Sequence, residues 1–121
     1  MLYSFDSLSY IKTIPHQDTY NFLLRNMSPV DLNDIKTTLN SKIDTNEIHT
    51  SSWIPGSDWT NTPYMKIYEA CGEDEELAAK CFGLILWIVM MERGEVWSFG
   101  KYEMNGIPIE GITYFKLERA P

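Results

Sequence analysis

The sequence predicts a small α+β domain in which a C-terminal antiparallel β-hairpin packs on a buried apolar helix. Three observations support this prediction. Residues 74–93 repeat apolar side chains with helical period, Asn105-Gly106 is a strong signal for a two-residue hairpin turn, and 121 residues are enough for one domain. We therefore expect residues 1–121 to form a single globular unit with about four helices.

The first part of the chain predicts a weak strand followed by two helices. The strand is expected within residues 8–14, and a helix over 18–27 is expected to have Asp18 as its cap. The helix expected over 28–43 has a clearer start, because a serine cap is followed by Pro29 at the first helical position. Its apolar residues follow one narrow stripe, which indicates an amphipathic helix.

The middle of the chain is less regular. The sequence allows a strand over 48–54 within a long polar segment that ends near residue 62. A short helix is expected from Pro63 to Cys71, with Gly72 as its left-handed stop. The next helix, over 74–93, is apolar on most sides and is therefore expected to lie at the centre of the core.

The C-terminal hairpin can be given a register by counting outward from Asn105-Gly106. This count pairs Met104 with Ile107, Phe99 with Ile112 and Trp97 with Tyr114. The pairs place aromatic side chains opposite aliphatic or aromatic ones, which is favourable across antiparallel strands. The order of helices and hairpin is similar in outline to winged-helix domains, although no motif specific to them is present.

The charge of the chain argues against direct binding to nucleic acid. Seventeen acidic side chains against ten basic ones give a net charge of −7. Phosphate binding needs clustered lysine and arginine, and the basic residues here are scattered. The longest apolar run, residues 81–91, is too short to cross a hydrocarbon layer of roughly 30 Å. We expect neither nucleic-acid nor membrane binding.

The cysteines and histidines predict no cofactor or metal site. The chain has two cysteines, Cys71 and Cys81, and two histidines that stand far apart. A zinc site needs more closely spaced ligands, and a disulfide framework needs more cysteines. Free, buried thiols in the reducing cytoplasm are expected.

Two segments predict an interaction surface. Five acids fall within residues 69–76, and they either complement the start of a helix or attract a basic protein. The segment 53–64 is rich in aromatic residues and either covers the core or forms a contact surface. The candidate partner-binding residues are Trp53, Asp58, Trp59, Glu69, Glu73, Asp74, Glu76 and Trp87.

The leading hypothesis is a non-enzymatic module of the inhibitor, immunity or regulatory type that binds a basic protein. A second hypothesis is a small hydrolase or transferase in which His49 acts with Ser57 or Asp58. No established catalytic motif accompanies these residues. A third hypothesis is a homodimer formed through the hairpin edge or the face of Trp87.

Overall fold

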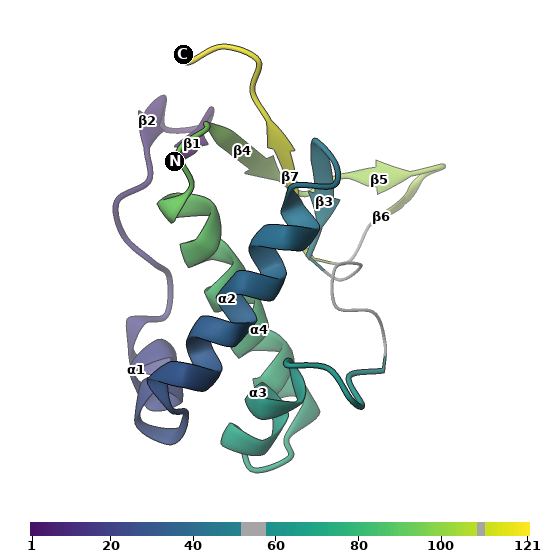
Figure 1. The fold of residues 1–121 in the computed structure, drawn as a ribbon. Coiled ribbons are helices and arrows are strands. Elements are labelled where there is room, and N and C mark those ends of the chain that lie inside the picture. The colour runs from purple at the N-terminus through teal and green to yellow at the C-terminus, as the bar shows by residue number, and fades with distance from the viewer. Residues whose placement is uncertain (52–57, 109–110) are drawn as a thin grey trace.

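The computed structural model describes residues 1–51, 58–108 and 111–121. Within them, four helices lie on one side of a five-stranded sheet (Figure 1), which confirms the α+β class. The helices are α1 (Gln17–Asn26), α2 (Pro29–Ile43), α3 (Met65–Ala70) and α4 (Glu75–Glu92). The strands of the sheet are β1 (Leu2–Ser4), β2 (Ser9–Tyr10), β3 (Ile48–Thr50), β4 (Trp97–Gly100) and β7 (Thr113–Lys116). A separate two-stranded ribbon is formed by β5 (Glu103–Met104) and β6 (Ile107–Pro108).

The sheet joins segments from both ends of the chain in the order β2-β1-β4-β7-β3. Strand β1 runs parallel to β4, with Leu2 opposite Trp97, and all other neighbours are antiparallel. Strands β2 and β3 lie within the segments that the sequence indicated. Strand β1 was not predicted, because three residues are too few to show a period of two.

Local signals at the helix ends agree with the sequence except at the starts of α1 and α3, the second of which begins at Met65 rather than at Pro63. The hydroxyl of Ser28 accepts a hydrogen bond from the Asp31 amide at 3.1 Å, and the Asp74 carboxylate accepts one from the Leu77 amide at the same distance. The prediction that Asp18 caps α1 is wrong. The cap is His16, whose carbonyl accepts the amides of the first turn, and Asp18 lies inside that turn.

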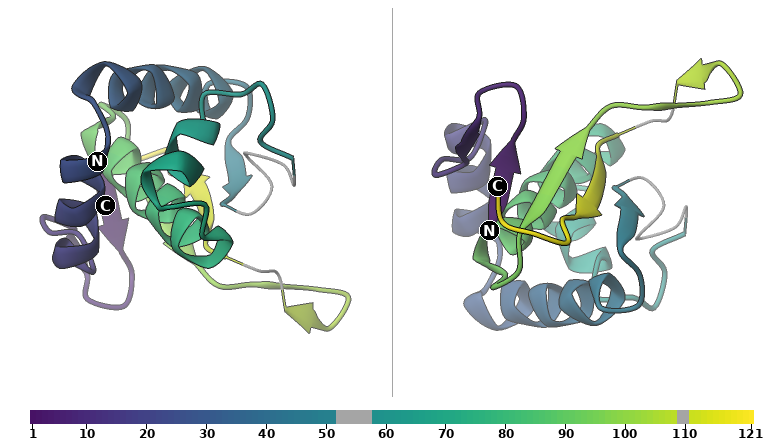
Figure 2. Two further views of the ribbon diagram at one scale, coloured as in Figure 1. Left: turned by 90° about the horizontal axis from the view of Figure 1, so that it is seen from below. Right: turned by 90° about the horizontal axis from the view of Figure 1, so that it is seen from above.

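Helix α4 is the centre of the core, as its pattern predicted. Nine of its residues are buried, and α1, α2 and α3 surround it on the sides away from the sheet (Figure 2). On the sheet side, the Trp87 ring lies 4.8 Å from Phe99 and 6.5 Å from Tyr114. Each large apolar side chain buried in this way contributes about 1.5–3 kcal/mol. The C-terminal hairpin therefore packs on α4.

The register of the hairpin differs from the predicted one beyond its tip. Met104 lies opposite Ile107 as predicted, but Phe99 lies opposite Tyr114 rather than Ile112. Trp97 likewise faces Lys116 rather than Tyr114. The predicted register is kept at the pair Glu103 and Pro108, whereas the ladder of β4 with β7, which includes the pair Gly100 and Thr113, is shifted by two residues. The register shifts by an even number of residues, so each side chain keeps its predicted face.

A polar cluster around Arg93 joins the ends of α2 and α4 to strand β4. The Arg93 side chain is 12% exposed; its Nε donates to Glu95 at 2.6 Å and its Nη1 to the Asn40 side chain at 2.7 Å. Nη2 forms an ion pair with Asp44. The indole of Trp97 donates to the same Glu95 carboxylate at 3.1 Å. Burial alone would raise the pKa of Glu95, but these hydrogen bonds outweigh it and lower the pKa to about 2.

Replacing Glu95 by glutamine is expected to lower the free energy of unfolding at neutral pH by about 1.5–3 kcal/mol, because charge-assisted hydrogen bonds are lost. The folded-state pKa lies below the ordinary 4.5, so this contribution is complete above about pH 4.5 and disappears as the pH falls toward 2. Urea unfolding followed by tryptophan fluorescence should show a steeper acid loss in the wild type than in Glu95→Gln. The exposed Glu118→Gln is the control, and equal acid losses in all three proteins would contradict the assignment.

Candidate functional site

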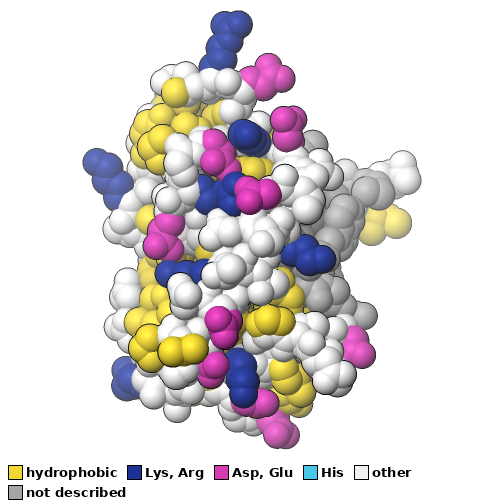
Figure 3. Space-filling view, viewed as in Figure 1, with side chains coloured by type: hydrophobic (Ala, Val, Ile, Leu, Met, Phe, Trp, Pro, Cys, Tyr) yellow, Lys and Arg dark blue, Asp and Glu magenta, His cyan; other side chains and the backbone are white. Residues whose placement is uncertain are grey.

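The acidic residues identified in the sequence gather at the turn between α3 and α4. We call Glu69, Glu73, Asp74, Glu75 and Glu76 the acidic end; all five are exposed. Acidic side chains, in magenta, are visible at the lower end of the molecule in Figure 3, where α3 and the start of α4 lie. The acids that cluster along the chain therefore also cluster in space as exposed carboxylates.

Helix capping explains only part of the acidic end. Asp74 is the cap of α4, and Glu75 and Glu76 lie in its first turn, where carboxylates are favourable. Glu69 forms an exposed ion pair with Lys66 at 3.6 Å, and Glu73 lies in the turn with a left-handed backbone. Within the described part of the chain, Glu73, Glu75 and Glu76 form no ion pair. Their charge is therefore available to solvent.

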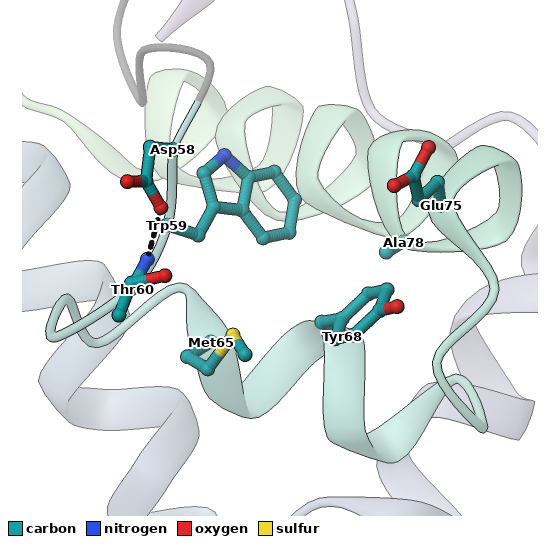
Figure 4. Close-up of a pocket in the computed structure, with 7 residues that line it drawn as sticks. All are labelled: Asp58, Trp59, Thr60, Met65, Tyr68, Glu75 and Ala78. Atoms are coloured by element: carbon teal, nitrogen blue, oxygen red, sulfur yellow. Dashed lines mark hydrogen bonds between the residues drawn. The ribbon is translucent and has the colours of Figure 1, made fainter.

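A hollow of about 470 Å³ lies beside the acidic end. Figure 4 shows Trp59 on one side of it and Tyr68 with Glu75 on the other, with Ala78 of α4 next to Glu75. The described residues that line it are Asp58, Trp59, Thr60, Met65, Tyr68, Glu75 and Ala78. The volume lies within the range of about 300–1,000 Å³ that is usual for ligand sites.

The position of the Trp59 ring is fixed by buried aromatic rings that pack against it. Its ring lies 6.2 Å from Tyr64 and 5.9 Å from Phe82, and both of these rings are buried in the core. Its carbonyl accepts hydrogen bonds from the amide and the hydroxyl of Thr62 at the approach to α3. The indole is half-buried, so it both covers Phe82 and forms a wall of the hollow.

Glu75 places a carboxylate beside the hollow, whereas Asp58 lines it with its carboxylate turned away, on the far side of Trp59 (Figure 4). The carboxylate of Asp58 is turned toward Thr60, whose amide donates to it at 2.9 Å (Figure 4). Hydrogen bonds from the Thr60 side chain and backbone keep the pKa of Asp58 below its usual value, so this group is ionised at neutral pH. The described lining contains no lysine or arginine.

The structure separates Trp87 from the other candidate residues. Trp87 is 9% exposed, and its indole nitrogen donates to the carbonyl of Thr13 at 3.3 Å. It lies in the core under the C-terminal hairpin, so it offers no contact surface and no homodimer face. Trp53 and Ser57 lie outside the described residues.

The side chain of His49 is positioned by backbone carbonyl groups at the end of α2. Its Nε2 lies 2.9 Å from the carbonyl oxygen of Ile43 and 3.0 Å from that of Asn46, at the end of α2. A ring nitrogen between two acceptors carries the hydrogen and donates. The structure gives no hydrogen bond between His49 and Asp58, and His49 is not among the described residues that line the hollow. In the residues described, His49 is therefore not oriented by Asp58 as a catalytic base would be.

A second surface was not anticipated from the sequence. Leu2 and Trp97 lie on the inner face of the sheet, which packs on α4. Because successive residues of a strand point to opposite faces, Tyr3 and the residues paired with it point away from α4. We call five rings on this side the open sheet face: Tyr3, Phe5, Tyr10, Tyr102 and Phe115. Their centroids follow one another at 5.2–6.5 Å. Seen from above in Figure 2, the strands lie in front of the helices, and no described helix covers them.

Comparisons with protein-family models, curated protein sequences and solved structures find no match to this chain. Among the described residues, no helix combines the length and the apolar character needed to span a bilayer.

Replacing His49 by alanine is expected to lower the free energy of unfolding by about 1 kcal/mol, because the carbonyls at the end of α2 lose their donor. Thermal or urea unfolding checks this value. His49→Gln keeps a side-chain donor and should recover part of the loss. If His49→Ala unfolds like the wild type, the capping role is wrong.

Proposed function

We propose that this protein is a non-enzymatic binding module that uses its acidic end to bind a basic protein. The observation that carries this proposal is a set of exposed carboxylates, four of them without an ion pair in the described structure, directly beside an aromatic-walled hollow. Capping of α4 alone would require neither Glu69 nor Glu73. The partner relation we favour is inhibition, immunity or regulation.

The charge distribution supports fast and selective association. The chain carries a net charge of −7, and the acidic end concentrates five carboxylates within eight residues. Opposite potentials on two proteins raise their association rate by about 10–1,000-fold at low salt. Trp59 adds a rigid aromatic contact, which is the kind of residue that dominates binding energy at interfaces.

The test compares two triple variants with equal net charge. Glu69→Lys/Glu73→Lys/Glu76→Lys reverses the acidic end, and Asp6→Lys/Asp34→Lys/Glu118→Lys reverses three exposed acids elsewhere. Asp74 is left intact because its side chain caps α4. Basic proteins retained by the wild type at low salt are identified, and their association rates with each variant are measured by surface plasmon resonance.

We expect the first triple to slow association by about tenfold or more at low salt, and high salt to remove most of the difference. The second triple should bind nearly as the wild type does. Equal rates for the two triples would show that only the overall charge matters and would contradict the proposal.

The two thiols lead us to propose a reducing compartment, the cytoplasm, for this module. The sulfur atoms of Cys71 and Cys81 lie 3.6 Å apart as free thiols, and both residues are buried. Burial raises the pKa of Cys81 to about 12, so it remains a protonated, unreactive thiol. A reducing environment would preserve this packed pair.

The open sheet face supports a second candidate, self-association. Phe5 is 52% exposed and Tyr102 46%, and both rings contact Phe115 on a sheet face that no described helix covers. Contiguous exposed aromatic surface of this kind is typical of protein interfaces.

Sedimentation velocity over a wide concentration range tests this candidate. The wild type should form dimers as its concentration rises, and Phe5→Ser/Tyr102→Ser should remain monomeric because it removes the exposed rings. Leu24→Ser/Val30→Ser is the matched control, since these exposed apolar residues lie on α1 and α2. A wild type that stays monomeric, or a Phe5→Ser/Tyr102→Ser variant that still dimerises, would exclude this candidate.

A further inference from the structure

We infer that the hollow between Trp59 and α4 binds an arginine side chain that projects from the basic partner. This inference rests on the proposed function and adds the chemical group that the partner inserts. It depends on the walls of the hollow, on its charge and on its position beside the acidic end.

The walls provide flat aromatic surface at a fixed position. Trp59 packs against Tyr64 and Phe82 behind it, so its ring cannot move far without opening the core. Tyr68 comes from α3 and stands on the other side of the hollow in Figure 4, with Met65 beside it. A planar cation that enters between these walls can stack on an aromatic face.

The charge of the lining selects a cation. Glu75 lies on the same side as Tyr68, and Asp58 lies at the Trp59 side (Figure 4). No described lysine or arginine lines the hollow, and Lys66 on the neighbouring helix already pairs with Glu69. An anion would therefore meet the Glu75 carboxylate with no positive group in the described lining to compensate it.

The combination favours arginine over lysine. A guanidinium group is planar, stacks on aromatic rings and can donate two hydrogen bonds to one carboxylate. A lysine ammonium is a compact and strongly hydrated point charge, which gains less from a flat aromatic wall. The surrounding acidic end would attract the positive segment that presents this arginine.

The experiment titrates the isotope-labelled protein with Nα-acetyl-arginine amide and follows amide and indole signals by NMR. The Trp59 indole signal is assigned with Trp59→Phe. We expect saturable shifts at Trp59, Tyr68 and Glu75. The citrulline amide has nearly the same shape without the charge, and we expect its affinity to be lower by about fivefold or more.

Two variants distinguish binding in the hollow from a general effect of negative charge on the protein. Glu75→Gln should weaken binding of the arginine amide by about fivefold, because the guanidinium loses its carboxylate. Asp18→Asn is the matched control: it also removes one acid from the first turn of a helix, but on α1, and should bind like the wild type. Circular dichroism verifies that both variants are folded.

Several results would overturn the inference. Shifts that do not saturate, equal binding of the citrulline amide, or equal binding by Glu75→Gln would each show that the hollow takes no guanidinium. Lysine amide binding as tightly as arginine amide would overturn the choice of arginine.

The inference and the proposed function fail in different ways. If the arginine amide binds in the hollow but reversal of the acidic end leaves partner association unchanged, the proposed function fails while the guanidinium site remains. If reversal slows association but no arginine amide binds, the acidic end is the docking surface and the inference about the hollow is wrong.

Discussion

The need to remove helix α4 from water on nearly every side determines the rest of the structure. Few sides of this helix are polar, so neither the three other helices nor the sheet alone could cover it. The helices cover one part and the inner face of the sheet covers the other, with Leu2, Trp97 and Tyr114 contributing to the same core. The two ends of α4 remain at the surface, and each has its own polar structure: the acidic end at its start and the Arg93 cluster at its end.

The sequence was most informative where structure depends on neighbouring residues. The cap at Ser28, the start of a helix near residue 74 and the apolar surface of α4 were all predicted, because each is determined within a few residues. Predictions that depended on distant segments were less successful. Strand β1 exists because β4 pairs with it, and the register of β4 with β7 differs by two residues from the one counted outward from the hairpin tip.

The candidate site shows the same division. The acidic end is a cluster along the chain and was therefore visible in the sequence. The hollow was not, because it forms only when the segment at Trp59, the helix carrying Tyr68 and the start of α4 come together. Trp87 was a candidate contact residue, but its ring packs against Phe99 and Tyr114 of the sheet. The open sheet face had a weak signal in the alternation of Tyr3 and Phe5.

The parallel pairing of β1 with β4 affects how the chain can fold while it is being synthesised. All four helices are complete by residue 92, whereas β4 and β7 follow, and Leu2 must wait for Trp97 before it has a neighbour. Contacts between such distant positions form slowly because a long loop must close first. The nascent chain therefore holds a nearly finished helical layer with one apolar side exposed, and only strands that are synthesised after the helices can cover that side.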